Sequence, residues 1–365
     1  FAHIPLLKPL FEYKLNEDQT KNIWLDQKKF DQAQGLLKIE GDSIPKLSVW
    51  LKSQPVDLKA WQTFFRAEKG WPHPEKAGKP SVDVLQALGK FEATMAKLTQ
   101  AAKERPLCLY DVNYERHYSA LLPHLAIYKN IVRSFSLRAL AHLGNNDPES
   151  ALADVRMCLF LVESIRDEPT LISQLVRIAC LQIALGPVWE GLKDEKWNAE
   201  QLTTIEKQLA AIDLPKDYRI SMLCEREMAN LAIDQMRENP KLLGTLLEDD
   251  APVFKFIPDG WFYHNQRRFN EMHIKFLQTI VAPKARRIHP DIAVAFNKEL
   301  DARKKRKFPI YDILSSMLLP ALDKVARKIG SAQTTVDHAR IACHLELHKL
   351  KHKKYPEKLA GLESL

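Results

Sequence analysis

The sequence predicts an all-α fold, with helical hairpins arranged in a solenoid-like or two-lobed array. Apolar residues recur at steps of three and four along most of the chain, which is the spacing of one helix face. Glycine is scarce, at 12 of 365 residues, and no stretch of more than four residues alternates convincingly between apolar and polar side chains. Lys, Leu, Ala, Glu and Gln dominate the composition, and these residue types favour helices.

We divide the chain into three regions. Residues 1–110 are expected to form an N-terminal helical region with proline-rich loops, residues 111–248 a central helical hairpin core, and residues 249–365 a C-terminal helical region. An apolar content of 45% is ordinary for a soluble globular protein, and a chain of this length can bury a large core.

The N-terminal region is expected to begin with an extended segment and to continue with helices. Prolines among apolar residues indicate an extended lead-in over residues 1–15, and residues 16–34 are interpreted as a helix. The segment from Asp57 to Lys69 and residues 81–104 both follow the helical period, so we expect one continuous helix over each.

The central region predicts two antiparallel helices. The first covers residues 120–143 and ends at Gly144, which is expected to take the left-handed conformation that closes a helix. Asp147 is expected to cap the second helix, with Pro148 in its first turn, and that helix ends near Arg166.

A third helix follows that is apolar almost all round. We expect Asp167 to cap it and expect it to lie in the middle of the fold, running to about residue 185. Arg177 and Gln182 interrupt the apolar sequence before 18 residues have passed, so we interpret it as a core helix and expect no membrane span in the chain.

Further helices are predicted in the rest of the chain. Asn198 is expected to cap one, and residues 217–238, 261–281 and 332–352 match the helical period. Prolines frame a short segment over residues 310–319.

The densest aromatic and polar cluster spans residues 258–266. Such a cluster can line a ligand groove, but we favour its interpretation as the anchored start of a core helix with Asp259 as the cap.

Several short sequence segments together resemble a group of exported or membrane-anchored helical proteins of planctomycete and verrucomicrobial bacteria. The segments lie between about residue 137 and the C-terminus, and the resemblance implies no particular activity. They are Ala151–Asp154, Asp167–Ile172, Leu175-Val176, Glu225-Arg226, Gly260-Trp261 with Asn265, and Tyr355–Leu359.

Two local resemblances accompany it. The segment Leu137–Leu161 resembles one tetratricopeptide unit, although no neighbouring unit repeats at a period near 34 residues. The helix with Ala339–Ala342, followed by Tyr355-Pro356 and Leu359, is similar to the end of the long helix in type II secretion pseudopilins. The N-terminal pilin helix and the small C-terminal domain are both missing from this chain, so the similarity implies an envelope context and no pilin function.

Charge and metal-binding residue types give few candidate sites. The formal net charge is +8, and the one local basic run consists of Arg303, Lys304, Lys305, Arg306 and Lys307. His344, His348 and His352 share one helix face, but lysines surround them, so we interpret that face as solvated and expect no metal and no cofactor. The five cysteines show no C-x-x-C spacing.

Carboxylates gather at one helix junction, where Glu163, Asp167 and Glu168 lie close together in sequence. Paired carboxylates can perform acid–base catalysis, but at helix ends they more often act as caps and surface ion-pair partners. The sequence contains none of the short motifs of hydrolases, P-loop enzymes, dinucleotide-binding enzymes or kinases.

These observations favour a non-enzymatic scaffold or protein-interaction module of the bacterial envelope, with another protein as its partner. One alternative is an enzyme or small-ligand binder with a pocket between two helical series, the helices before and after about residue 190. This pocket would use Glu225, Arg226, Trp261 and Asn265. Another is anion or nucleic-acid binding through the basic run, although no nucleic-acid-binding motif accompanies it. We expect export or anchoring on the periplasmic side, with the cytoplasm as the alternative and membrane attachment only through a segment outside this chain.

Overall fold

The all-α fold class is confirmed. The structure is a computed structural model, and it describes residues 5–15, 22–104, 108–239, 242, 257–304, 314, 319 and 322–359. Long helices dominate these residues, beside two small antiparallel sheets of two strands each. The sheets pair β1 (Tyr13–Leu15) with β2 (Asn22–Trp24), and β3 (Val281–Ala282) with β4 (Arg287–Ile288).

The start of the chain differs from the sequence prediction. Instead of an extended lead-in, residues 5–10 form the 3-10 helix η1 (Pro5–Leu10), and β1 follows it. Of the helix expected over residues 16–34, only α1 (Gln27–Gln34) is helical, and residues 16–21 lie outside the described part. The Trp24 indole stacks on Phe30, with ring centroids 3.9 Å apart, so this pair of rings joins β2 to α1.

The next helices pack beside the central hairpin. The expected helix after Asp57 is confirmed as α2 (Leu58–Ala67), and the Asp57 side chain accepts a hydrogen bond from the amide of Ala60. The single helix expected over residues 81–104 is wrong, because α3 (Pro80–Leu88), the 3-10 turn η3 (Gly89–Phe91) and α4 (Glu92–Glu104) replace it. Glycine at position 89 weakens the helix there, and the turn lets α3 contact α2 and α5 while α4 contacts α6.

The predicted hairpin is confirmed as α5 (His124–Gly144) and α6 (Pro148–Ser164), with Asp147 as the cap of α6. Gly144, however, stays helical, and Asn146 is the residue with a left-handed φ, of 62°. The need for glycine at position 144 is steric, because a Cβ there would lie 2.7 Å from Cδ1 of Leu58.

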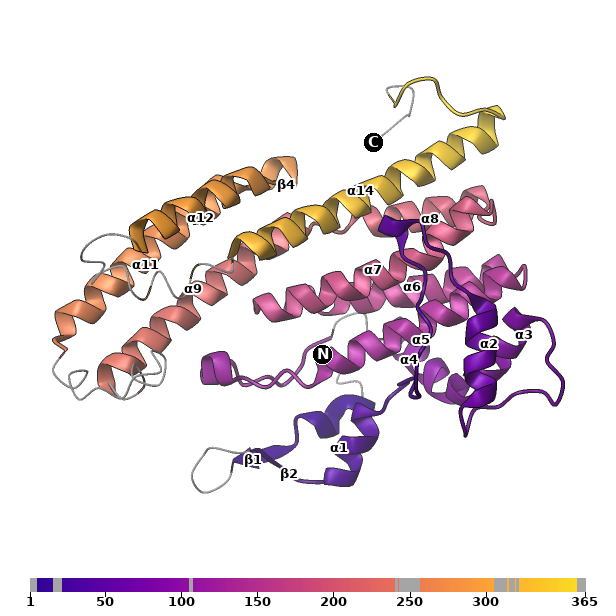
Figure 1. The fold of residues 1–365 in the computed structure, drawn as a ribbon, viewed down its shortest axis with the longest axis horizontal. Coiled ribbons are helices and arrows are strands. Elements are labelled where there is room, and N and C mark those ends of the chain that lie inside the picture. Colours follow the sequence, from indigo (N-terminus) through magenta and orange to yellow (C-terminus); the bar gives the residue numbers. More distant parts are fainter. Residues whose placement is uncertain are drawn as a thin grey trace.

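The third helix is confirmed as the central one. α7 (Leu171–Lys193) contacts α5, α6, α9 (Leu214–Glu238) and α14 (Leu322–His352), and it lies in the middle of the body in Figure 1. Its cap is Thr170, not Asp167, because the Thr170 hydroxyl accepts the hydrogen bond from the amide of Ser173.

α7 also continues through Pro187, past the predicted end. Proline has no amide to donate to the carbonyl of Ile183 one turn earlier. The hydroxyl of Ser136 on α5 donates to that carbonyl instead, at 3.1 Å, so the helix continues without an unsatisfied acceptor. By length and composition α7 could cross a membrane, since its most apolar 18-residue stretch has a mean hydropathy of 1.6. However, 61% of that stretch is buried inside the protein.

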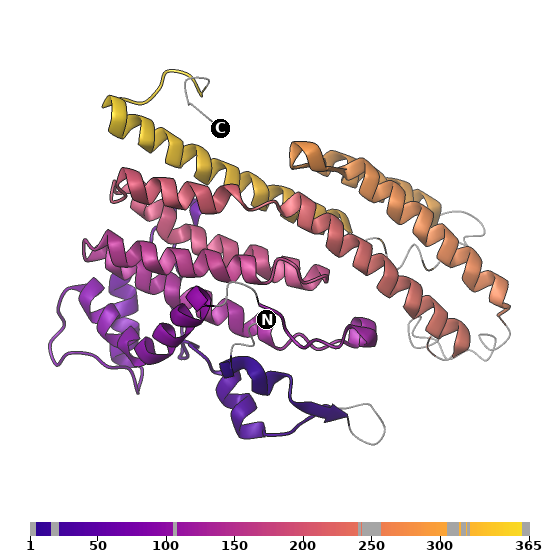
Figure 2. The same cartoon turned by 180° about the vertical axis from the view of Figure 1, so that it is seen from behind.

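The helices after α7 divide between the body and an arm that extends from it. α8 (Ala199–Ala210) and α14 pack together on the body, whereas α9, α11 (Asp259–Ile280) and α12 (Pro290–Lys304) extend beyond it (Figures 1 and 2). α14 begins at Leu322, before the predicted residue 332, and α11 is preceded by Pro258 as its cap residue, so Asp259 lies inside the helix. The segment expected over residues 310–319 lies outside the described residues, except for positions 314 and 319.

One apolar core connects these elements. It runs from Leu7 at the N-terminus to Cys343 on α14 and includes residues of α5, α6 and α7. A smaller cluster lies under α2 and α3, and a third joins α9 to α11.

We predict that Gly191→Ala destabilises the fold. A Cβ at Gly191 would overlap the indole of Trp197, which is buried and donates a hydrogen bond to the carbonyl of Val188 at 3.1 Å. Overpacking of this kind costs about 1–3 kcal/mol. The matched control is Gly89→Ala, where no atom lies within 4 Å and alanine should raise the stability by about 0.5–1 kcal/mol. Urea unfolding measures both, and equal changes would contradict the packing argument.

Candidate functional site

The outward face of α7 forms the floor of a groove between α5, α14 and the segment at residues 44–49. Two adjoining cavities, of about 490 and 500 Å³, lie along this face and share Ala179 and Gln182. We call this feature the α7 groove and define its floor as Leu175, Ile178, Ala179, Gln182 and Ile183. With a helical rise of 1.5 Å per residue, this largely apolar floor extends for about 12 Å.

The sides of the α7 groove are basic. Its lining contains six cationic side chains: Lys46, Lys129, Arg133, Lys324, Arg327 and Lys328. Among the described residues that line the two cavities, none is acidic and none is aromatic. Arg327 pairs with Asp323 at 3.2 Å. Across the described ranges, no carboxylate forms an ion pair with Lys129, Arg133, Lys324 or Lys328.

The guanidinium of Arg133 is half-buried. Its burial lowers the pKa of the group, but an arginine remains charged at any physiological pH. A charge that is partly removed from water without a partner is unfavourable, and an anion placed in the groove would compensate it. Electrostatically, this side of the groove is therefore suited to a negatively charged ligand.

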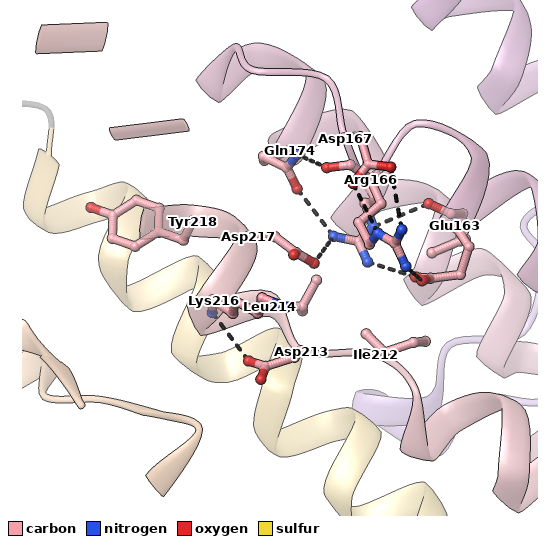
Figure 3. Close-up of polar contacts among 12 residues, drawn as sticks. Glu163, Arg166, Asp167, Gln174, Ile212, Asp213, Leu214, Lys216, Asp217 and Tyr218 are labelled. Atoms are coloured by element: carbon pink, nitrogen blue, oxygen red, sulfur yellow. Dashed lines mark hydrogen bonds and ion pairs between the residues drawn. The ribbon is translucent and has the colours of Figure 1, made fainter. Parts of the chain in front are cut away.

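The inward face of α7 carries a buried cation that is paired with carboxylates. The side chain of Arg177 is fully buried, with an exposed fraction of 0%. Its guanidinium donates to Asp217 on α9 and to Glu163 on α6, each at 2.6 Å. Figure 3 labels these two carboxylates and Gln174, which lie around one point between the helices. The guanidinium also donates to the Gln174 side chain and to the carbonyl of Val162, so all three nitrogens have partners.

These bonds join three helices below the groove. Burial raises the pKa of the Asp217 carboxyl, while the adjacent guanidinium of Arg177 acts against that rise. Each carboxylate faces the guanidinium and neither lines the α7 groove, so we assign the cluster a structural role. It fixes the position and rotation of α7, and thereby the shape of the groove floor.

The carboxylates predicted at the α6–α7 junction belong to two networks. Glu163 also contacts the more exposed Arg166, which pairs with Asp167 at 3.1 Å. Glu168 instead accepts from Ser173 and contacts the buried His124, both at 2.5 Å. Because the glutamate stands between the hydroxyl and the imidazole, this geometry differs from a Ser–His–acid relay, in which histidine takes the central place.

A pair of tyrosines extends the second network towards the N-terminal region. The hydroxyls of Tyr110 and Tyr128 are hydrogen-bonded, and Tyr128 also contacts the hydroxyl of Ser164 at 2.9 Å. The Tyr110 ring stacks on the imidazole of His124, with centroids 4.2 Å apart. Burial raises the pKa of both phenols, so they remain neutral hydrogen-bonding groups at physiological pH.

Glu225 and Arg226, the first two residues of the predicted pocket, point to different partners. The Glu225 carboxylate accepts the amide of Leu171 at 3.1 Å, at the start of α7, and burial raises the pKa of this carboxyl. The guanidinium of Arg226 pairs with the exposed Glu227 at 2.5 Å. Neither residue lines the α7 groove.

Trp261 and Asn265, the other two, lie on the first turns of α11. Trp261 packs against the apolar cluster that joins α9 to α11. The buried Asn265 donates to the carbonyl of Trp261 at 3.0 Å and accepts from the amide of Leu314 at 3.3 Å. The structure therefore does not bring these two residues together with Glu225 and Arg226 around either cavity of the groove.

The other basic and histidine candidates give no common site. In the basic run, positions 305–307 lie outside the described residues, as do the side chains of Arg303 and Lys304. His344 lies 3.4 Å from Glu206, whereas His348 contacts the carbonyl of Lys354 at 2.9 Å. Within the described residues, no group of three metal-ligating side chains is close enough to hold an ion.

The residues of the α7 groove were not predicted from the sequence. The cations come from segments far apart in the sequence, and no local run connects Lys129 on α5 with Lys328 on α14. One local signal was present, because Gln182 is a polar residue within an apolar stretch of the sequence, and the structure shows its side chain exposed.

Comparisons with protein families, with curated proteins and with solved structures found no match.

We predict that Arg177→Met destabilises the protein by about 3–5 kcal/mol, because it leaves the buried carboxylate of Asp217 without its ion-pair partner and removes one of the partners of Glu163. The matched control is Arg166→Met. Arg166 also pairs with Glu163, but its side chain is 42% exposed, so its loss should cost less than about 1 kcal/mol. Urea unfolding at pH 7 measures both variants. Similar losses would contradict the structural role assigned to the buried guanidinium.

We predict a pH-dependent loss of stability from His273 on α11. The imidazole is buried, and neither ring nitrogen has a hydrogen-bond partner within the described residues. Burial, aided by the charge of Arg226 and opposed by Glu227, lowers its pKa from 6.5 to about 4. The unfolded chain therefore binds this proton at higher pH than the folded protein. The contribution is present above pH 6.5 and is lost as the pH falls towards 4.

The size of the effect is about 3 kcal/mol. His273→Leu removes the titrating group, so the decline in unfolding free energy between pH 6.5 and pH 4.5 should become shallower. Urea unfolding at a series of pH values measures the slope, and His338→Leu on α14 is the control for an exposed imidazole. Identical slopes for the wild type and His273→Leu would refute this assignment.

Proposed function

We propose that this chain is a non-enzymatic protein-interaction module that binds its partner in the α7 groove. The observation that supports the proposal most directly is the combination of an apolar floor with basic sides that have few carboxylate partners. An exposed apolar surface bordered by polar groups is typical of an interaction site. The envelope location of such a module rests on the sequence resemblance alone.

The position of the groove on packed helices supports a preformed binding site. Its floor belongs to α7 and two of its sides to α5 and α14, which both contact α7 in the body. α7 is held from below by the Arg177 bonds to α6 and α9. Binding sites on well-packed helices are more precisely arranged than sites on loops, and less conformational freedom is lost when a partner binds.

Site-specific photo-crosslinking in the native host tests this proposal. A benzoylphenylalanine at position 182, in the centre of the floor, should form a covalent adduct with one protein, identified by mass spectrometry. The same amino acid at exposed Thr203 on α8 is the control, since that position lies outside the groove. Absence of a protein adduct at position 182, or the same adducts at both positions, would overturn the proposal.

A further inference from the structure

We infer that the α7 groove binds an acidic amphipathic helix of a partner protein. The inference rests on the proposed function and gives the chemical nature of the partner segment. Three features of the groove lead to it: the spacing of the cations, the composition of the lining and the length of the floor.

The cations on both long sides follow a helical spacing. Lys129 and Arg133 are four residues apart on α5, and Lys324 and Lys328 are four residues apart on α14. On a helix this separation corresponds to about 6 Å along the axis. Glutamates four residues apart on a bound helix would have the same spacing, so two carboxylates on each flank could face two cations.

The floor fits the apolar face of the same helix. Leu175, Ala179 and Ile183 are also spaced by four residues and form one row along α7. An amphipathic helix binds a groove through apolar residues at intervals of three and four, with its polar flanks towards the edges. A floor of about 12 Å accommodates slightly more than two turns of such a helix.

The lining argues against other anionic ligands. Single-stranded nucleic acids bind where bases stack on aromatic side chains, but none of the described lining residues of the two cavities is aromatic. A fatty acid has an apolar chain that suits the floor, but its one carboxylate would leave most of the cations without a partner. A helix with several carboxylates and an apolar stripe matches both features.

Fluorescence anisotropy with the intact protein tests the inference. The probe is a labelled 18-residue peptide of Leu, Ala and Glu, with Leu at helical intervals and Glu on both flanks. The first control is a scrambled peptide of the same composition, which has the same charge but no apolar face. We expect the amphipathic peptide to bind at least about tenfold more tightly than the scrambled peptide, with an affinity that falls as salt rises.

Two charge-reversal variants locate the binding site. K129E/K328E places a carboxylate on each side of the groove and should weaken binding of the peptide at least about tenfold. K207E/K298E changes the net charge by the same amount on exposed parts of α8 and α12 and should leave the affinity within about twofold. Circular dichroism and urea unfolding confirm that both variants remain folded.

The results separate this inference from the proposed function. No preference for the amphipathic peptide, equal effects of the two charge reversals, or tighter binding of dodecanoate or of a single-stranded oligonucleotide would overturn the inference. A protein adduct at position 182 together with any of those results would leave the groove as an interaction site while excluding an acidic helix as its ligand. Failure of the crosslink would overturn the proposed function itself.

Discussion

The fold depends on the burial of one charge, the guanidinium of Arg177. Removing this group from water is costly, and the cost is offset only when Asp217 from α9 and Glu163 from α6 are both in place. The three helices α6, α7 and α9 are therefore coupled at one point. A rotation or shift of α7 would break at least one of these bonds, whereas apolar contacts alone would tolerate small adjustments.

As a consequence, α7 holds a few buried polar groups within a mainly apolar inward face, and it also has apolar residues on its outward face. Arg177 and Gln174 are buried, while Leu175, Ala179 and Ile183 reach the groove. An ordinary amphipathic surface helix has polar residues on its outward face instead. Because the inner bonds fix the orientation of α7, the outer apolar row cannot turn inwards to escape water.

The helices were largely predictable from sequence, whereas the groove was not. Local patterns identified α5, α6 and the central position of α7, since a cap such as Asp147 and an apolar period act within one segment. Thr170 replaced Asp167 as the cap because the choice between nearby oxygens depends on tertiary geometry. Continuation of α7 through a proline depended on a hydroxyl from α5, and the cations of the groove come from separate segments, so neither had a local signal.

The charge distribution shows why the groove is suited to an external ligand. The whole chain has 54 basic and 46 acidic residues, which is close to balance, and exposed ion pairs such as Lys275–Glu299 are common on the described surface. The lining of the groove departs from this pattern, because its described residues include six cations and no carboxylate. Like charges on opposite sides repel each other, and within the described part of the chain Arg327 is the one cation of the lining that has a carboxylate partner. A ligand that brings several carboxylates together with an apolar face relieves the repulsion and covers the exposed apolar floor in one binding event.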